Sequence, residues 1–348
     1  MNPQIVTLGQ PAASAIGDSG AQIATSTTAV RAAAATPEAV AAADAAARHW
    51  RFAEDRPAPA GSDRHRRMFS QMMRETFNPY KPAVIPWPVL DPEARQRLIS
   101  LPIWDTAVQV EGRARLCIRS FARSVQDPAV REALELMGFE EGRHKEVLFH
   151  LVAFYGIELK PEPGYVEPKD PERAFMTTGI SECFDSFFAF GLFELARRSG
   201  YFPEALVETF EPVVQEEARH ILFFTNWLAW HRHTMPWWRR PYFWFKTLSV
   251  WILVVRERIG FARGMNTSEK NDAAFTVTSA QSMSSQKIDP AELMDICLAE
   301  NDRRLAGYDW RLRRPTAVPR AIRAARLFIW PRRKGDGVAS SGLSARRH

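Results

Sequence analysis

Cysteine is scarce in this chain of 348 residues, which has only Cys117, Cys183 and Cys297. No pair has the C-x-x-C spacing of a zinc knuckle or a rubredoxin-type iron site, and three scattered thiols cannot build a disulfide framework. We therefore expect a reducing, cytoplasmic setting. The first thirty residues lack the basic and apolar segments of a secretory signal, although their Ala-, Ser- and Thr-rich composition leaves an organellar transit peptide open.

Long apolar runs and strand-like alternation are missing as well. The apolar run from Leu248 to Val255 is too short to span a bilayer, because a spanning helix needs about 20 residues. No segment alternates apolar and polar residues as a half-buried strand does. The sequence therefore predicts an all-α protein.

Positive charge is concentrated at one end of the chain. The formal net charge is +6, but the segment from Arg303 to His348 alone carries +11, so the preceding 302 residues sum to about −5. The body of the protein is slightly acidic, which argues against nucleic-acid binding.

Composition and helical periodicity divide the chain into five predicted segments. They are a largely disordered Ala-rich leader (1–62, with one helix open near 39–52), a Pro-rich approach segment (63–91), a four-helix bundle (92–231), an aromatic-rich helical extension (232–305) and a basic tail (306–348). Within the bundle, turn signals fall at 126–128, 161–171 and 199–203. Beyond it we expect a loop over 231–241, a linker over 265–287 and a helix that starts at Pro290.

The run Glu-Glu-x-Arg-His occurs twice, at 140–144 and at 216–220. Each copy contains Glu-x-x-His, a spacing that places a carboxylate and an imidazole on one helix face, one turn apart. A lone Glu-x-x-His is a weak signal, whereas two extended copies in helical segments are much more specific. The residues so paired are Glu141 with His144 and Glu217 with His220.

Apolar residues around these pairs repeat in steps of four and three. Leu206, Phe210, Val213, Phe224 and Trp227 follow this pattern around the second copy, which places its carboxylate and imidazole in the seam that faces the core. An unpaired carboxylate there would cost several kcal/mol, a cost that divalent cations can remove by supplying the opposite charge.

A reflection through the turns selects one further ligand on each of the two remaining helices. Antiparallel neighbours joined by a short turn bring residues to equal height when they are equidistant from that turn. The midpoint of Glu111 and Glu141 falls at position 126, and that of Glu182 and Glu217 falls between 199 and 200, both inside predicted turns. Glu194 would instead move the second turn to about 205, inside a helix.

The surroundings of Glu182 suggest room for a substrate. Small residues lie beside it at Thr178, Gly179, Ser186 and Ala189, and several phenylalanines make the same helix apolar. Small side chains next to a metal ligand leave space, so we expect an apolar pocket there.

The motif pattern resembles the ferritin-like di-iron carboxylate proteins, in which two helices give one Glu each and two give Glu-x-x-His. The likeness covers residues 92–230 and is strongest to the oxygen-activating branch of monooxygenases, desaturases and oxidases. It implies a ferritin-like four-helix bundle with additional C-terminal helices. It also implies two iron ions, with manganese or a mixed site as alternatives, held by Glu111, Glu141, His144, Glu182, Glu217 and His220.

The resemblance further implies roles for individual residues. Glu111 and Glu182 would be terminal ligands, and Glu141 and Glu217 bridging ones. The ring N–H groups of His144 and His220 would be held by Glu216 and Glu140, which would pair with Arg143 and Arg219. The branch usually has Asp where Glu140 and Glu216 occur here, one methylene longer.

Three departures exclude named subfamilies. Leu148 occupies the position of the ribonucleotide reductase radical tyrosine, and Val213 that of the extra histidine of the N-oxygenases. The Cys-rich iron domain of rubrerythrins cannot form from three cysteines. The resemblance then implies a di-iron, O₂-dependent oxygenase that hydroxylates, desaturates or rearranges an apolar small molecule, with electrons from a separate donor protein.

Alternatives stay open at several points. The six residues could be salt-bridged structural charges, and the protein could be an oxidase, a peroxidase or an iron-binding protein without an organic substrate. Six of eleven Trp fall between Trp227 and Trp251, interleaved with cations, which is typical of a helix at the inner membrane face and also of a helix that covers the bundle. The basic tail could bind anionic lipid, an acidic carrier protein or nothing, and a homodimer is open.

Overall fold

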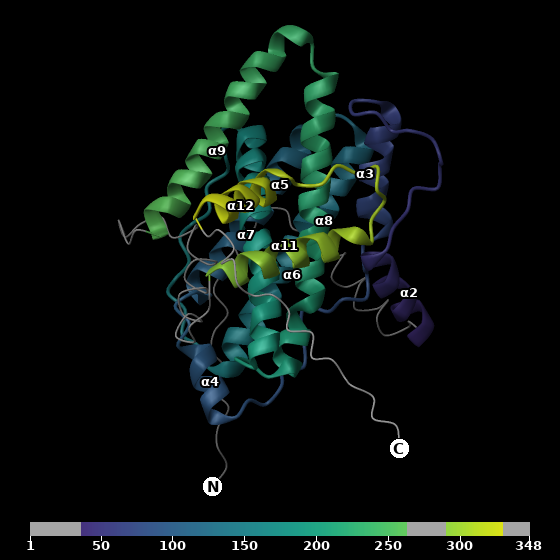
Figure 1. Cartoon of the computed structure of the whole chain (residues 1–348). Coiled ribbons are helices and arrows are strands. Elements are labelled where there is room, and N and C mark those ends of the chain that lie inside the picture. The colour runs from purple at the N-terminus through teal and green to yellow at the C-terminus, as the bar shows by residue number, and fades with distance from the viewer. Residues whose placement is uncertain (1–35, 263–289, 330–348) are drawn as a thin grey trace, which may run out of the picture.

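The computed structural model describes residues 36–262 and 290–329 (Figure 1). These ranges are helical and contain no strand; Trp50 and Tyr308 form an isolated β-bridge between distant parts of the chain. The prediction of an all-α protein is confirmed for them. The predicted linker over 265–287 and the ends of the chain (1–35 and 330–348) lie outside the described residues.

The described helices follow one another with short connections. They are α2 (Pro37–Arg48), α3 (Asp63–Glu75), α4 (Pro92–Ile99), α5 (Trp104–Ser124), α6 (Pro128–Tyr155), α7 (Pro171–Ser199), α8 (Glu204–Thr234), the 3₁₀ turn η1 (Trp237–Arg239), α9 (Arg240–Ala262), α11 (Pro290–Ala306) and α12 (Ala317–Ile329).

The turns between the long helices fall where the sequence predicts them. The Asp127 carboxylate accepts hydrogen bonds from the backbone N–H groups of Ala129 and Val130, and Pro128 occupies the first helical position. Gly200, at φ +62°, ends α7 in the left-handed conformation that glycine adopts without strain. These two turns fix α5 against α6 and α7 against α8 as antiparallel pairs.

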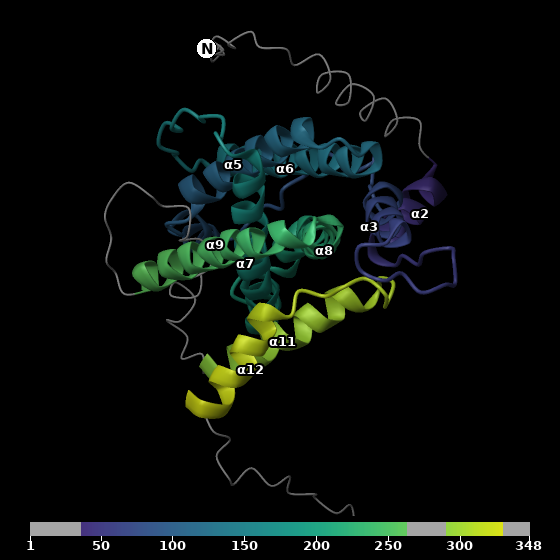
Figure 2. The ribbon, with the colours of Figure 1, turned by 90° about the horizontal axis from the view of Figure 1, so that it is seen from above.

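The four long helices pack around a shared core (Figures 1 and 2). α5 packs along α6 and also touches α7, and α7 packs along α8. α6 and α8 touch each other only slightly, because α3 lies against both. α11 and α12 cover α7 on the side away from α5 and α6, as Figure 2 shows from above.

Two predicted segments before residue 92 are more structured than expected. The helix left open near 39–52 is present as α2, but Trp50 and Phe52 after it are buried, and the predicted approach segment opens with α3. α3 buries Met68, Phe69, Met72 and Met73 on one face, and its charged face obscures this signal in the sequence. The described leader residues and α3 are therefore part of the packed body.

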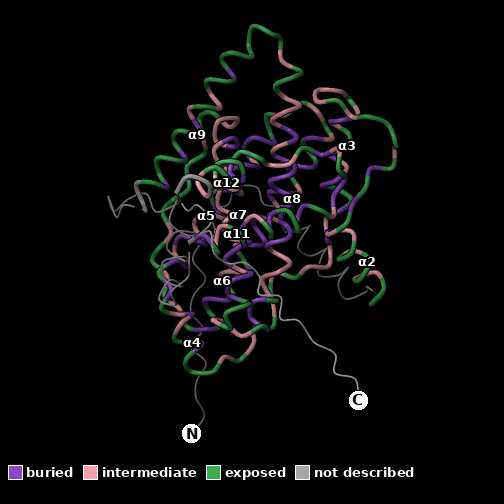
Figure 3. Tube along the Cα trace, viewed as in Figure 1, coloured by how far each residue is buried: buried purple, intermediate pink, exposed green. Residues whose placement is uncertain are grey.

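The C-terminal half also departs from the predicted boundaries. The expected loop over 231–241 is mostly helical, since α8 runs to Thr234 and η1 leads directly into α9. The basic tail contains α12, while the helix predicted to start at Pro290 is confirmed as α11. α9 packs on α7 through Phe243, Val250 and Val254 but leaves its outer face exposed, as Figure 3 shows.

Candidate metal centre

Four helices bring the six predicted ligand residues together in the core. The residues and their helices are Glu111 on α5, Glu141 and His144 on α6, Glu182 on α7, and Glu217 and His220 on α8. Their ligand-type atoms form two groups, and in each group these atoms all lie within 4.8 Å of one another. The groups are Glu111, Glu141, His144 and Glu217, and Glu182, Glu217 and His220. Because Glu217 belongs to both, the two groups are adjacent.

Four buried atoms of this cluster have no hydrogen-bond partner within the described part of the chain. They are Glu141 Oε1, His144 Nδ1, Glu182 Oε1 and His220 Nδ1. His220 Nδ1 lies 2.9 Å from Glu141 Oε1, and His144 Nδ1 lies 3.2 Å from Glu217 Oε1, yet neither nitrogen makes a hydrogen bond. Buried polar atoms are normally satisfied, so orphaned atoms that gather at one place fit a shared cation. The cluster is thus able to hold a metal ion.

The other ring nitrogen of each histidine is held by a carboxylate from the opposite motif. His144 Nε2 lies 2.8 Å from Glu216 Oε2, and His220 Nε2 lies 2.8 Å from Glu140 Oε2. A carboxylate at Nε2 keeps the proton there, which leaves Nδ1 with its lone pair directed into the cluster. The two motifs therefore hold each other's imidazoles crosswise.

Two buried arginines satisfy Glu216 and Glu140, which we call the outer carboxylates. Arg143 Nη2 donates to Glu216 Oε1 at 2.7 Å, and Arg219 Nη1 donates to Glu140 Oε1 at 3.0 Å. Each arginine lies directly before the histidine of its own motif and reaches across to the carboxylate on the other helix that holds this same histidine, so α6 and α8 are joined by charged contacts.

 Glu216 on α8 thus contacts both Arg143 and His144 of α6, and Glu140 on α6 contacts both Arg219 and His220 of α8.

Sequence reasoning missed the segment that completes this network. Lys81 Nζ lies 2.9 Å from Glu216 Oε1, Thr76 Oγ1 accepts from Arg219 Nε at 2.8 Å, and the Asn78 carbonyl accepts from Arg143 at 3.0 Å. These residues follow α3, in the predicted approach segment. A lysine, a threonine and an asparagine among prolines give no local signal, because their partners are more than sixty residues away in the sequence.

The pKa values of two ligand carboxylates, Glu141 and Glu182, shift in the opposite direction from those of Glu140 and Glu216, which hold the imidazoles. Burial raises the pKa of Glu182 to about 8, aided by the negative charge of Glu217, and burial likewise raises the pKa of Glu141 well above its usual value. Burial also tends to raise the pKa values of Glu140 and Glu216. The positive charges of Arg219 beside Glu140 and of Arg143 beside Glu216 outweigh burial, so both pKa values are lowered.

The two imidazoles respond to the surrounding carboxylates. Burial opposes their charged forms, yet contacts with carboxylates raise the pKa values of His144 and His220 well above the usual range, led by Glu111 for His144 and Glu140 for His220. Without metal, the cluster therefore holds protons, and a cation that binds to Nδ1 and to the carboxylates has to displace them.

Aromatic side chains of α5, α7 and α8 pack on one another within about three turns of the ligand residues along these helices. Phe121 on α5 stacks on Phe175 on α7, with ring centroids 4.8 Å apart, and Phe224 and Trp227 on α8 meet Phe175 edge-on. The Phe224 ring occupies the space beside Gly179, where an added Cβ would lie 2.2 Å from Phe224 Cδ2. The space directly beside Gly179 is therefore filled by Phe224.

Other residues weighed from the sequence lie away from the cluster. Glu194 binds Arg197 and Arg198 near the end of α7. Asp185 pairs with Arg258 of α9, and Cys183 is a buried thiol whose pKa burial raises to about 12. None of the three belongs to either group of ligand-type atoms.

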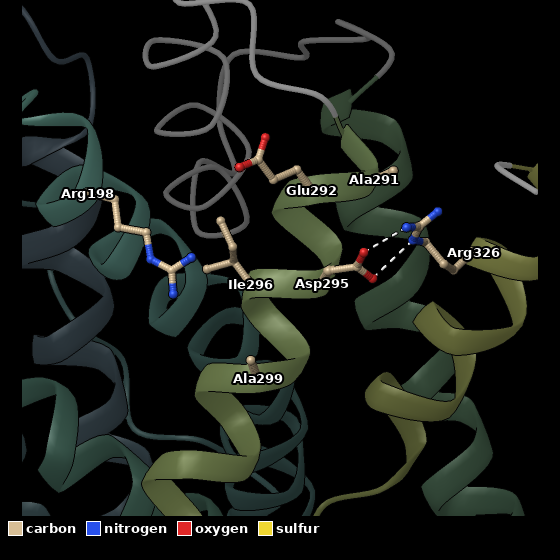
Figure 4. A pocket seen from close by; sticks show the side chains of 7 residues that line it. All are labelled: Arg198, Ala291, Glu292, Asp295, Ile296, Ala299 and Arg326. Atoms are coloured by element: carbon tan, nitrogen blue, oxygen red, sulfur yellow. Dashed lines mark hydrogen bonds and ion pairs between the residues drawn. The ribbon is translucent and has the colours of Figure 1, made fainter. Parts of the chain in front are cut away.

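An open hollow of about 370 Å³ lies at the end of α7, far from the cluster (Figure 4). It is bounded by Arg198, by residues of α11 and by Arg326 of α12, which pairs with Asp295. Arg198 follows Glu182 by sixteen residues, or about 24 Å along a helix. None of the residues that line this hollow belongs to the two groups of ligand-type atoms.

Comparisons with family models, curated proteins and solved structures found no match for the chain.

Proposed function

We propose that the chain is a di-iron, O₂-dependent oxygenase with a ferritin-like four-helix bundle formed by α5–α8. The observation that carries the proposal is the convergence of four carboxylates and two imidazoles with four orphaned buried atoms. Glu217, common to both groups, and Glu141, in the first group and 2.9 Å from His220 of the second, are the proposed bridging ligands. Glu111 and Glu182 are the proposed terminal ligands.

Charge balance argues against the alternative of purely structural salt bridges. The cations Lys81, Arg143 and Arg219 offset the two outer carboxylates with one charge to spare. If all four inner carboxylates (Glu111, Glu141, Glu182 and Glu217) are ionised, two imidazolium groups leave negative charge in excess. Without metal, only protons on Glu141 and Glu182, whose pKa values burial raises, remove that excess. Two divalent cations balance the inner set. Carboxylate and imidazole ligands suit iron, and manganese or a mixed site is the alternative.

Iron in such a ligand set supplies O₂ reduction when bound, and the protein controls its surroundings. Glu216 and Glu140 keep the proton of each imidazole on Nε2, so that Nδ1 is free to bind metal. The layer formed by Phe121, Phe175 and Trp227 keeps water from one end of the cluster. An apolar enclosure favours an organic substrate over mere iron storage, and electrons would come from a separate donor protein.

Iron stoichiometry tests the metal part of this proposal. The full chain is loaded with Fe(II) without oxygen, desalted and assayed by plasma mass spectrometry, and we expect two irons per chain. Mössbauer spectra after exposure to O₂ should show a pair of ferric ions coupled to each other. One iron per chain, or none, would contradict the di-iron proposal. Two irons without O₂-dependent oxidation of any added organic compound would favour the oxidase or iron-binding alternative.

We also propose that the outer face of α9 contacts an anionic lipid surface. No described helix is long and apolar enough to cross a bilayer. Nevertheless, Trp237, Trp238, Tyr242 and Phe245 are more than 60% exposed, and Arg239 and Arg240 lie among them. Aromatic rings interleaved with cations are typical of interfacial helices. Like charges on the same face disfavour a second copy of this chain as the occupant.

Vesicle flotation tests this contact. We expect the chain to float with vesicles that contain phosphatidylglycerol, and the double variant Trp237→Glu, Trp238→Glu to stay in solution. Trp310→Glu is the control, because Trp310 is 80% exposed but lies on another part of the molecule. Equal flotation of all three proteins, or dimers of the wild type without flotation, would overturn the lipid proposal.

A further inference from the structure

A second hollow, of about 330 Å³, lies where α7, α8 and α9 meet the segment 313–318. Its volume is within the roughly 300–1,000 Å³ range of small-molecule sites. Most of its wall is apolar, with Ile180, Leu228, Phe243, Trp244 and Trp251. It is distinct from the open hollow at the end of α7, whose lining is mostly charged.

This pocket comes close to the candidate metal centre. Its lining includes Cys183, which follows Glu182 directly on α7, and Phe224, which lies one turn after His220 on α8. Both side chains are almost fully buried. Phe224 also fills the notch at Gly179, three residues before Glu182 on α7, so its ring lies between the two helices at this point.

The pocket also carries two guanidinium groups that have no partner among the residues that the structure describes. Arg232 of α8 and Arg313 are exposed, and neither side chain forms a hydrogen bond or an ion pair within residues 36–262 and 290–329. Arg314, on the same pocket, differs because its guanidinium donates to the carbonyls of Leu305 and Tyr308. Two cations at the edge of an apolar pocket suit a ligand with a negatively charged head.

We propose that this pocket binds an amphipathic small molecule with an apolar tail and a carboxylate or phosphate head. The head binds Arg232 and Arg313, and the tail lies against the aromatic wall with its end toward Cys183 and Phe224. The proposal rests on the proposed function in one respect, namely that the bound molecule is the substrate of the metal centre. Phe224 then separates the bound tail from the metal, and its ring has to turn away from Gly179 for the tail to reach it.

Calorimetric titration with three ten-carbon probes tests the binding mode. Decanoate and decyl phosphate share the anionic head and differ in its chemistry, and decylamine has the opposite charge. We expect both anions to bind the full chain and decylamine to bind at least about tenfold more weakly, since one lost charge-assisted contact is worth roughly a factor of ten. The tighter anion identifies the head group.

Three variants locate the site. The double variant Arg232→Gln, Arg313→Gln should weaken anion binding by about tenfold or more, whereas Arg131→Gln, an exposed arginine on α6, should leave it unchanged. Ala229→Trp fills the pocket and should abolish binding while the unfolding temperature stays close to that of the wild type. Unweakened binding by either pocket variant, equal binding of decylamine, or no binding of any probe would overturn the proposal.

Iron content separates this proposal from the proposed function. The pocket variants should retain the same iron per chain as the wild type, because none of the changed residues belongs to the metal-binding groups. Loss of anion binding in chains that retain iron concerns the pocket alone. Anion binding by a chain that retains no iron would leave the pocket in place and remove the di-iron centre.

Discussion

The middle and the end of α7 each present a carboxylate, and the two have opposite surroundings. Glu194, near the end, accepts from Arg197 at 2.7 Å and from Arg198 at 2.6 Å, and these hydrogen bonds lower its pKa to about 2. Glu182, in the middle, has a buried oxygen with no hydrogen-bond partner among residues 36–262 and 290–329, and burial raises its pKa to about 8. One helix thus carries one satisfied and one unsatisfied acid.

The difference lies in where the partners come from. Glu194 finds both partners three and four residues further along its own helix, a spacing that stabilises a helix locally. The neighbours of Glu182 come from other helices and are Glu217 and His220, which bring no permanent positive charge. A buried acid among acids destabilises the fold, and a bound cation is what reverses that effect. The proposed metal site therefore includes the acid in the middle of α7 and not the one near its end.

The largest expected effect is on iron content, and it should distinguish Glu217, the ligand shared by both groups, from Glu194. Glu217→Ala removes the carboxylate common to both groups, so the chain should lose both irons after desalting. Glu194→Ala should retain them in full, because its carboxylate binds only arginines of α7. Plasma mass spectrometry measures the iron, and circular dichroism checks that both variants are folded. Similar iron contents in the two variants would show that Glu217 is not a ligand.

The pH dependence of the metal-free protein should follow Glu182. Because its folded-state pKa of about 8 exceeds the unfolded value of 4.5, its contribution is fully present below pH 4.5 and is lost as pH rises to about 8. The loss is on the order of 3–5 kcal/mol. The raised pKa values of His144 and His220 act in the same direction. Urea unfolding of chelator-treated protein between pH 5 and 9 measures this.

Glu194 should act in the opposite direction and in another pH window. Its folded-state pKa of about 2 lies below the unfolded value, so its contribution to stability is present above pH 4.5 and is lost as pH falls toward 2.

Iron should restore the stability that the metal-free protein loses above pH 7, since bound metal stabilises the ionised carboxylates. A metal-free protein that is equally stable at pH 5 and 9 would contradict the account of Glu182.

Much of the centre could be predicted from the sequence because its parts are local. The spacing of Glu141 and His144 is one helical turn, and the turns at Asp127 and Gly200 are marked by residues with strong turn preferences. A short turn fixes the relative height of two antiparallel helices. These local rules brought all six residues into one cluster and separated Glu182 from Glu194.

The rest depends on contacts that no local pattern encodes. Lys81 meets Glu216 across 135 positions of sequence, and α3 fills the space between α6 and α8 although its sequence is dominated by charged residues. The ring of Phe224 fills the notch at Gly179 because the two helices approach closely there, whereas the sequence shows only a small residue. Packing between distant elements decides these details.

Neutralising each acid should change stability in opposite directions. In the metal-free protein at pH 8, Glu182→Gln should raise the free energy of unfolding by about 1–3 kcal/mol, because it removes a buried charge. Glu194→Gln should lower it by up to about 1 kcal/mol, because it removes an ion pair with partly exposed arginines. At pH 5 the gain from Glu182→Gln should largely disappear, since the carboxyl is already protonated. A loss of stability in metal-free Glu182→Gln at pH 8 would contradict the role of burial.

The smallest expected effect is the salt dependence of these stability changes, which should differ between Glu194 and Glu182. Arg197 and Arg198 are about half exposed, so their attraction to Glu194 is screened when 1 M NaCl shortens the Debye length to about 3 Å. The stability lost in Glu194→Gln should therefore shrink from at most about 1 kcal/mol at low salt to a few tenths. The gain in Glu182→Gln should persist, because a desolvated carboxylate in the core is shielded from mobile ions. If salt reduces the stability changes of both variants equally, solvent ions reach Glu182, and its environment does not differ in kind from that of Glu194.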